Sequence, residues 1–306
     1  MVPIALVHVK ERKQLAKLSP VDAQVKLIQI WLHGKAPKSI KAYELYITQF
    51  LAFLAKPLRD VILEDLYDYS DYLLNSGLAP NTQKTRLYAV KSLISFAHTI
   101  GFIPFNVASA MKLKKTADRL SERLLSQKEV QKMVFATEEA QYRYKSEKQR
   151  DLLILKLLYT TALRVSELTQ LTWHDLTERS DGGQLTVVGK GEKSRSVLIP
   201  NELWKELLEF RKNAPDSAPI FPSRKGKGHL DKSQVKRIIE TAAKRAGINK
   251  KVSPHWLRHA HATHALENGA DIGLVKDTLG HDNVSTTSRY LHVRPNDSSS
   301  MYVPSL

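Results

Sequence analysis

The chain has 306 residues, which is long enough for two domains, and its 47 Lys and Arg against 31 Asp and Glu give a formal net charge of +16. It contains no cysteine, which excludes disulfides, cysteine-based zinc sites and thiol nucleophiles, and which is compatible with a reducing cytoplasm. The excess charge is +8 in residues 1–115 and +8 in residues 116–306, so both halves could contact one long polyanion such as DNA or RNA.

No segment is predicted to enter a membrane or a secretion pathway. The apolar stretch 1–9 lacks the basic n-region, full h-region and cleavage site of a signal peptide. The most apolar stretch, 152–163, contains Lys156 and is far shorter than the ~20 residues that span a bilayer. We therefore expect a soluble, cytoplasmic protein with no membrane partner.

The N-terminal part is predicted to be a small all-helical domain over residues 19–113, after an extension over 1–18. Its first helix starts at Ser19 and Pro20 and ends before Gly34. Apolar residues three and four apart predict further helices over about 40–54, 64–75 and 81–100, and a short fifth over 107–113. We expect core packing, in preference to base stacking, for the aromatic residues Trp31, Tyr43, Tyr46, Phe50 and Phe53.

Residues 112–126 are highly charged and show little sustained periodicity. We place the domain linker at 114–126, although a solvated helix would fit the same stretch. From 127 to 306 the chain is predicted to be mainly helical, with one hairpin whose strands, 184–188 and 196–199, flank a lysine-bearing tip at 189–193. Helices are expected over 127–136, 151–160, 201–211, 233–246, 254–268, 271–279 and 285–293. The fold class is therefore mainly α (α+β), with a small antiparallel sheet.

Four segments of this second part hold residues suited to attack on a phosphodiester. Ser253 is a good N-cap and Pro254 a good first helical residue, which places His255 and Arg258 one turn apart on one helical face. Backbone N–H groups at such a helix start favour an anion. The other segments are 161–168 with an arginine, the hairpin tip with a lysine, and 280–290 with a histidine and a tyrosine. The complete set is Arg164, Lys190, His255, Arg258, His281 and Tyr290.

In this order, and over about 130 residues, the four segments resemble those of the tyrosine recombinases, the family of phage integrases and Xer-type chromosome-resolving enzymes. The resemblance covers nearly the whole chain. It implies a SAM-like helical core-binding domain at 19–113 and a catalytic domain at 127–306. It also implies that Tyr290 is the nucleophile, that Arg164 and Arg258 clamp the scissile phosphate, and that Lys190, His255 and His281 complete the active site.

Two features of the sequence leave details of this resemblance open. Ala162 stands where many members of the family have glycine, so the turn before Arg164 could differ. Lys193 lies three residues after Lys190, so either lysine could be the one that reaches the DNA.

The chemistry explains these residue types. Two guanidiniums offer planar, permanently charged donors to the non-bridging oxygens of a phosphate. A tyrosine phenol, with a pKa of about 10, needs a base such as His255 to remove its proton at neutral pH. Lys190 can protonate the departing 5′ oxygen, and His281 can donate to a phosphate oxygen. Attack would leave a 3′-phosphotyrosyl bond that keeps the energy of the broken bond, so no ATP is expected. The cations make a metal unnecessary, and no other cofactor is expected.

Each candidate also has a structural interpretation. Arg164 could form an ion pair with Glu167, which we expect to orient a guanidinium or complete the fold. Lys190 could be a solvated turn residue, and Tyr290 a packed aromatic. A zinc site is not expected at His255, His259, His261 and His264, because an HExxH motif and cysteines are absent. We expect His259, His261 and His264 to be packing residues or to support the residues of the site.

The expected function is that of a site-specific DNA recombinase or integrase acting on double-stranded DNA recombination sites. The resemblance implies a tetramer assembled on paired sites, and leaves open a second recombinase or an accessory DNA-bending protein as a partner. Two alternatives are a catalytically inactive DNA-binding regulator of the same fold and a type IB topoisomerase-like relaxing enzyme. The target sequence, and the choice among integration, excision, inversion and dimer resolution, stay open.

Overall fold

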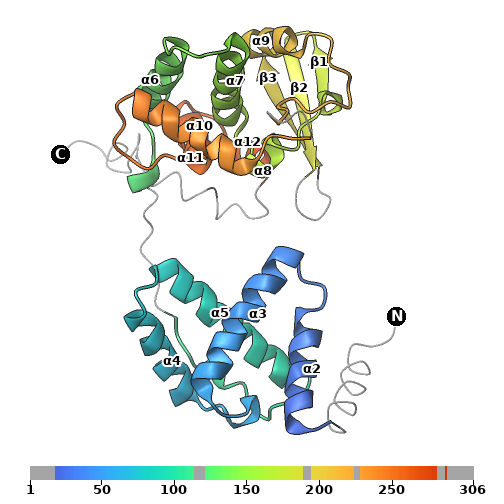
Figure 1. Cartoon of the computed structure of the whole chain (residues 1–306), viewed down its shortest axis with the longest axis vertical. Helices are drawn as coiled ribbons and strands as arrows, with labels where there is room; N and C mark the ends of the chain where they lie inside the picture. Colours follow the sequence, from blue (N-terminus) through green and yellow to red (C-terminus); the bar gives the residue numbers. More distant parts are fainter. Residues whose placement is uncertain (1–17, 114–120, 189–193, 224–227, 281–286, 288–306) are drawn as a thin grey trace, which may run out of the picture. The chain divides into compact units, whose positions relative to one another are not determined.

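The computed structural model describes residues 18–113, 121–188, 194–223, 228–280 and Thr287 (Figure 1). The chain divides into two compact units, Met1–Ala117 and Asp118–Leu306. Within the described ranges, the first unit is helical and the second is mostly helical with one small antiparallel sheet. The predicted fold class is therefore confirmed. No helix in these ranges is both long enough and apolar enough to cross a bilayer.

The first unit packs its helices around one apolar core. The helices are α2 (Pro20–Leu32), α3 (Pro37–Leu54), α4 (Leu63–Asn75) and α5 (Pro80–Thr99), with 3-10 turns at Leu58–Asp60 and Val107–Ser109. Helix α5 contacts α2, α3 and α4, and its apolar face supplies Val90, Leu93 and Ile94 to the core. Of the aromatic residues expected in the core, Trp31 and Phe50 are buried, and Tyr43 and Tyr46 pack against it. Phe53 is 36% exposed at its edge.

Two predicted helix starts in this unit were too late. Helices α3 and α5 begin at Pro37 and Pro80, because the fixed φ of proline suits the first helical position. Asn81, where the predicted range starts, is therefore the second residue of α5. The fifth helix is reduced to the 3-10 turn Val107–Ser109, since so short a segment bears the whole cost of helix nucleation for few hydrogen bonds.

The second unit is arranged around helix α7 (Lys145–Thr161), which contacts α6 (Gln127–Glu138), α9 (Asn201–Arg211) and α11 (Pro254–Glu267). Its leucines fill the core from one turn to the next. The remaining helices are α8 (Val165–Leu168), α10 (Lys232–Arg245) and α12 (Ile272–Leu279), and 3-10 turns lie at Ser121–Arg123 and Trp173–Asp175. Leu125, in the stretch expected to be a linker, is fully buried in this core. The predicted helix over 285–293 lies outside the described residues, apart from Thr287.

The sheet has the strand order β1 (Leu176–Arg179), β2 (Gly182–Val188), β3 (Ser194–Pro200), all antiparallel. Strands β2 and β3 form the predicted hairpin, and their register pairs Val188 with Ser194 beside the segment 189–193. Strand β1 was not predicted, because it is short and, apart from Leu176, consists of polar residues that are exposed at the sheet edge. Helix α7 begins earlier than expected for the same reason: its first residues, KSEKQR, show no apolar pattern.

Candidate active site

The turn between α7 and α8 positions Arg164. Helix α7 ends at Thr161, and the residue that caps it, Ala162, has the left-handed conformation φ 52°, ψ 27°. Arg164 is the N-cap of α8, and its backbone N–H donates to Glu167 Oε2 at 2.7 Å. Its Nη1 donates to Glu167 Oε1 at 2.8 Å. Glu167 thus holds both the main chain and the side chain of Arg164.

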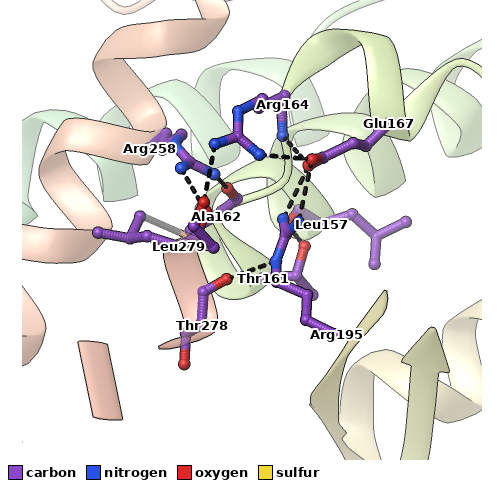
Figure 2. A network of polar contacts seen from close by, with 10 residues as sticks. Leu157, Thr161, Ala162, Arg164, Glu167, Arg195, Arg258, Thr278 and Leu279 are labelled. Carbon is purple, nitrogen blue, oxygen red and sulfur yellow. Dashed lines mark hydrogen bonds and ion pairs between the residues drawn. The ribbon is translucent and has the colours of Figure 1, made fainter. Parts of the chain in front are cut away.

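Arg258 is brought to the same place by α11. Its side chain is buried, and its Nη1 donates to the carbonyl of Ala162 at 2.6 Å while its Nη2 donates to the carbonyl of Leu279 at 2.5 Å. Arg164 Nη2 donates to the adjacent carbonyl of Gly280 at 3.1 Å. Figure 2 shows the two arginines gathered at these carbonyls. The ends of α7 and α12, far apart in sequence, therefore converge on one pair of guanidiniums.

Sequence reasoning missed a third arginine at this site. Arg195 on β3 donates from Nη1 and Nη2 to the two oxygens of Glu167 at 3.0 and 2.8 Å, and from Nε to the carbonyl of Thr278 at 2.8 Å. Burial by itself raises the pKa of Glu167, but hydrogen bonds from Arg195 and Arg164 outweigh it and lower that pKa to about 2. A signal was present in the sequence, because Arg195 shares a strand face with the buried Val197 and Ile199.

His255 lies at the start of α11, one turn before Arg258. The helix begins at Pro254 as predicted, although the side chain of Ser253 at the N-cap position makes no capping hydrogen bond. Although His255 lies at the surface, partial desolvation of its ring lowers its pKa below 6.5, and the positive charges of Arg258 and Arg164 lower it further. The imidazole is therefore neutral near pH 7 and able to accept a proton.

The other histidines of α11 pack around this site, as expected. The ring of His259 stacks on that of His255 with 6.0 Å between centroids. His261 Nδ1 lies 2.8 Å from the carbonyl oxygen of Tyr159, and His264 Nδ1 lies 3.0 Å from the Tyr159 hydroxyl. Within the described ranges, no group of three His, Asp or Glu side chains is placed to hold a metal ion.

The structure thus brings together three of the six predicted site residues, namely Arg164, His255 and Arg258. Lys190, His281 and Tyr290 lie outside the described residues, as does Lys193. Their described neighbours are at the site: Arg195 stands two residues after 189–193, and the Gly280 carbonyl that accepts from Arg164 precedes His281. Two anchored guanidiniums beside a neutral imidazole can bind an anion and accept a proton next to it.

Comparisons with known proteins show what this chain is similar to. Residues 123–297 match the phage integrase family, and residues 27–99 match the N-terminal SAM-like domain of phage integrases. The chain is 32% identical over 287 residues to the tyrosine recombinase XerC of Pelobacter propionicus, a match that covers 90% of this chain and 92% of the relative. It is 32% identical over 272 residues to the tyrosine recombinase XerD of Rhizobium meliloti, covering 85% and 86%.

A solved structure shares the fold. The XerH site-specific recombinase bound to its difH substrate is similar with a TM-score of 0.69 and 21% identity, covering 97% of this chain and 93% of the XerH chain.

The Glu167→Gln variant tests the electrostatics of the site. Because the pKa of Glu167 is about 2 in the folded state against an ordinary 4.5, its ionisation stabilises the fold above pH 4.5, and this contribution is lost as the pH falls toward 2. The shift corresponds to about 3 kcal/mol. Urea unfolding should therefore show a deficit of that order for the variant between pH 5 and 8, narrowing below pH 4.5. A deficit that does not depend on pH would contradict this account.

Substitutions at Ala162 test the left-handed turn. Ala162→Gly removes about 1–2 kcal/mol of left-handed strain. It also loses about 0.8 kcal/mol of methyl burial and about 0.4–1 kcal/mol through the freer unfolded chain. The free energy of unfolding should thus change by less than about 1 kcal/mol. Ala162→Val overfills a fully buried site and should cost about 1–3 kcal/mol in urea unfolding. Equal stabilities of the two variants would contradict the tight packing of this turn.

Proposed function

Because this chain belongs to the phage integrase family and is a tyrosine-type site-specific DNA recombinase, we propose that Tyr290 attacks a DNA phosphodiester held by Arg164 and Arg258. The attack releases a 5′ hydroxyl and leaves a 3′-phosphotyrosyl bond, which a second 5′ hydroxyl then attacks to rejoin the strand. The observation that carries this assignment is the anchoring of two guanidiniums beside His255 by main-chain carbonyls. The relatives favour this function over an inactive regulator or a topoisomerase.

The carbonyl contacts support the proposed clamp. The carbonyls of Ala162 and Leu279 hold the guanidinium of Arg258 in one orientation, and Glu167 and Gly280 hold that of Arg164. Donors fixed in this way do not need to reorganise as negative charge grows on the phosphate in the transition state. The Arg164 side chain is 35% exposed, so it can meet a strand at the surface.

Three other residues have roles in this proposal, two of them in proton transfer and one in binding the phosphate. His255, neutral near pH 7, accepts the phenolic proton of Tyr290. Lys190 on the hairpin tip donates a proton to the departing 5′ oxygen, with Lys193 as the alternative donor. His281 donates a hydrogen bond to a phosphate oxygen. The scheme needs no ATP, because the energy of the broken bond is kept in the phosphotyrosyl bond, and it needs no metal, because the arginines supply the positive charge.

In this proposal the first unit binds DNA and the second catalyses strand cleavage. We assign core binding to residues 19–113, the linker to 114–126 and catalysis to 127–306, after an extension over 1–18. The partners are double-stranded DNA recombination sites, on which the chain assembles as a tetramer in the cytoplasm. A second recombinase or an accessory DNA-bending protein would complete some assemblies. The net charge of +16, and the difH substrate bound to the similar XerH structure, support DNA as the partner.

The nucleophile can be tested with a DNA substrate that carries a nick near the scissile phosphate, because loss of the cut fragment traps the covalent intermediate. Wild type should give a protein–DNA adduct that survives denaturing electrophoresis, with EDTA present or absent. Tyr290→Phe should give none, while the control Tyr302→Phe should react as wild type. An adduct with Tyr290→Phe would disprove the assignment, and strict dependence on magnesium would argue against the scheme.

The role of His255 predicts a pH profile for the cleavage step. Because the pKa of His255 is lowered below 6.5, the single-turnover rate should be flat from about pH 7 to 8 and fall at more acidic pH as the imidazole gains a proton. His255→Gln should lower the plateau by about 10²–10⁴-fold and remove the acid limb. His174→Gln, an exposed histidine of the same unit, serves as the control. An unchanged acid limb in His255→Gln would assign the base to another group.

A further inference from the structure

We propose that Arg195 is a positioning residue for strand cleavage, which acts through Glu167 on Arg164 and connects the catalytic hairpin to the end of α12. The proposal rests on the proposed function and adds a residue outside the predicted set. The observation behind it is one arginine side chain on β3 that makes hydrogen bonds to two other segments of the site, through Glu167 and Thr278 (Figure 2).

The first contact joins Arg195 to Glu167 as a bidentate pair at 3.0 and 2.8 Å. The Arg195 and Glu167 side chains are 11% and 8% exposed, whereas the Arg164 side chain is 35% exposed. The carboxylate of Glu167 is therefore paired with Arg195, which is largely buried, and with Arg164, which is partly exposed. Arg195 holds Glu167 in place, and Glu167 in turn fixes the guanidinium that we assign to the phosphate.

The second contact joins Arg195 Nε to the carbonyl of Thr278 in the last turn of α12. Gly280 follows in a left-handed conformation at φ 62°, and a Cβ on it would lie 3.1 Å from Arg195 Cδ. Arg195 is also the second residue of β3, the strand that follows segment 189–193 in the chain. The side chain thus connects the base of the Lys190 hairpin to the turn that leads into His281.

The charge balance explains why the site needs a second arginine on this carboxylate. With Arg195 present, the group of Arg164, Arg195 and Glu167 carries a net charge of +1. Arg195 then shares the negative charge of Glu167, and Arg164 is not the only cation that balances it. Without Arg195, the carboxylate would neutralise Arg164 and draw its donors inward, away from a phosphate. A lysine at 195 would keep the charge but could not bind both carboxylate oxygens in a fixed plane.

Stability alone does not account for a charge at this position. Arg195 shares the inward face of β3 with Val197 and Ile199, where an apolar side chain would pack. Replacing a whole buried ion pair by apolar residues of similar volume is often neutral or stabilising, whereas removing one partner destabilises because it leaves a buried charge. In Arg195→Met the carboxylate of Glu167 keeps its ion pair with Arg164. We therefore expect the variant to fold with a lowered melting temperature, and to reveal the functional cost of losing the arginine when the rate is measured well below that temperature.

The test measures three quantities for the full chain: the single-turnover rate of adduct formation on nicked DNA, the dissociation constant for the same DNA, and the melting temperature. Arg195→Met should slow cleavage by about 100-fold and Arg195→Lys by about 10-fold, the scale expected when a supporting contact is lost. DNA affinity should change by less than about 3-fold, since the exposed cations remain. The control is Arg179→Met, an exposed arginine of β1 paired with Asp181.

A double-mutant cycle separates positioning from a general structural effect. If Arg195 acts through Glu167, then Arg195→Met should cost little further rate in a Glu167→Gln background. Full additivity of the two losses would overturn the proposal, and so would wild-type cleavage by a folded Arg195→Met or Arg195→Lys. A rate loss that follows only weakened binding or a lowered melting temperature would overturn it as well.

Failure of the proposed function gives a different result. In that case wild type itself forms no adduct on DNA that it binds, and the positioning role of Arg195 falls with it. If Arg195→Met does not fold, then Arg195→Lys, which keeps the charge, decides the matter through the same rate and affinity measurements.

Discussion

The site depends on the buried carboxylate of Glu167, which lets two arginines occupy neighbouring positions. Guanidiniums repel one another, and a protein interior screens this repulsion less well than water. Glu167 offsets it by accepting hydrogen bonds from Arg164 and Arg195, and those bonds keep it ionised despite its burial. The carboxylate also accepts the backbone N–H of Arg164, so it fixes the turn as well as the side chain. Removing this one anion would disturb charge, turn and orientation together.

Arg258 is held by a different means, through the carbonyls at helix ends. The last carbonyls of a helix lack partners within the helix and carry its negative partial charge. Ala162 caps α7, and Leu279 is the last residue of α12, so their carbonyls are natural acceptors for a buried guanidinium. The left-handed conformation of Ala162 ends α7 beside Arg258. The strain at this alanine is thus explained by the position of the arginine.

Packing of α7 against α11 brings Arg164, His255 and Arg258 together. Leucines of α7 fill the core of the second unit, and α11 lies along the same helix. Arg164 follows α7 directly, while His255 and Arg258 stand on the first turns of α11. The cations are therefore supported by a rigid apolar core. Such support is what a preorganised phosphate site requires, because donors that move lose their advantage in the transition state.

Local patterns in the sequence predicted most of the helices, the hairpin, and the placement of His255 and Arg258 one turn apart on α11. Proline and capping residues favour helix starts through local geometry, whatever the tertiary structure. The spacing of His255 and Arg258 follows from helix geometry alone. The family resemblance then gave meaning to Arg164 and Arg258, which are 94 positions apart in the sequence. Polar segments such as β1 and the start of α7 escaped prediction, because periodicity is visible only where one face is apolar.

By itself, the sequence determined which residues could do the chemistry and which local elements carry them. Only the tertiary structure decided how their charges are balanced. In the sequence, Arg195 is a polar residue beside a predicted strand. Only the fold places it against Glu167, 28 positions away. Likewise, the carbonyls that orient Arg258 belong to Ala162 and Leu279, whose side chains gave no hint of this role. Main-chain acceptors and shared ion pairs depend on where helices end in space, and no local pattern of residues records that.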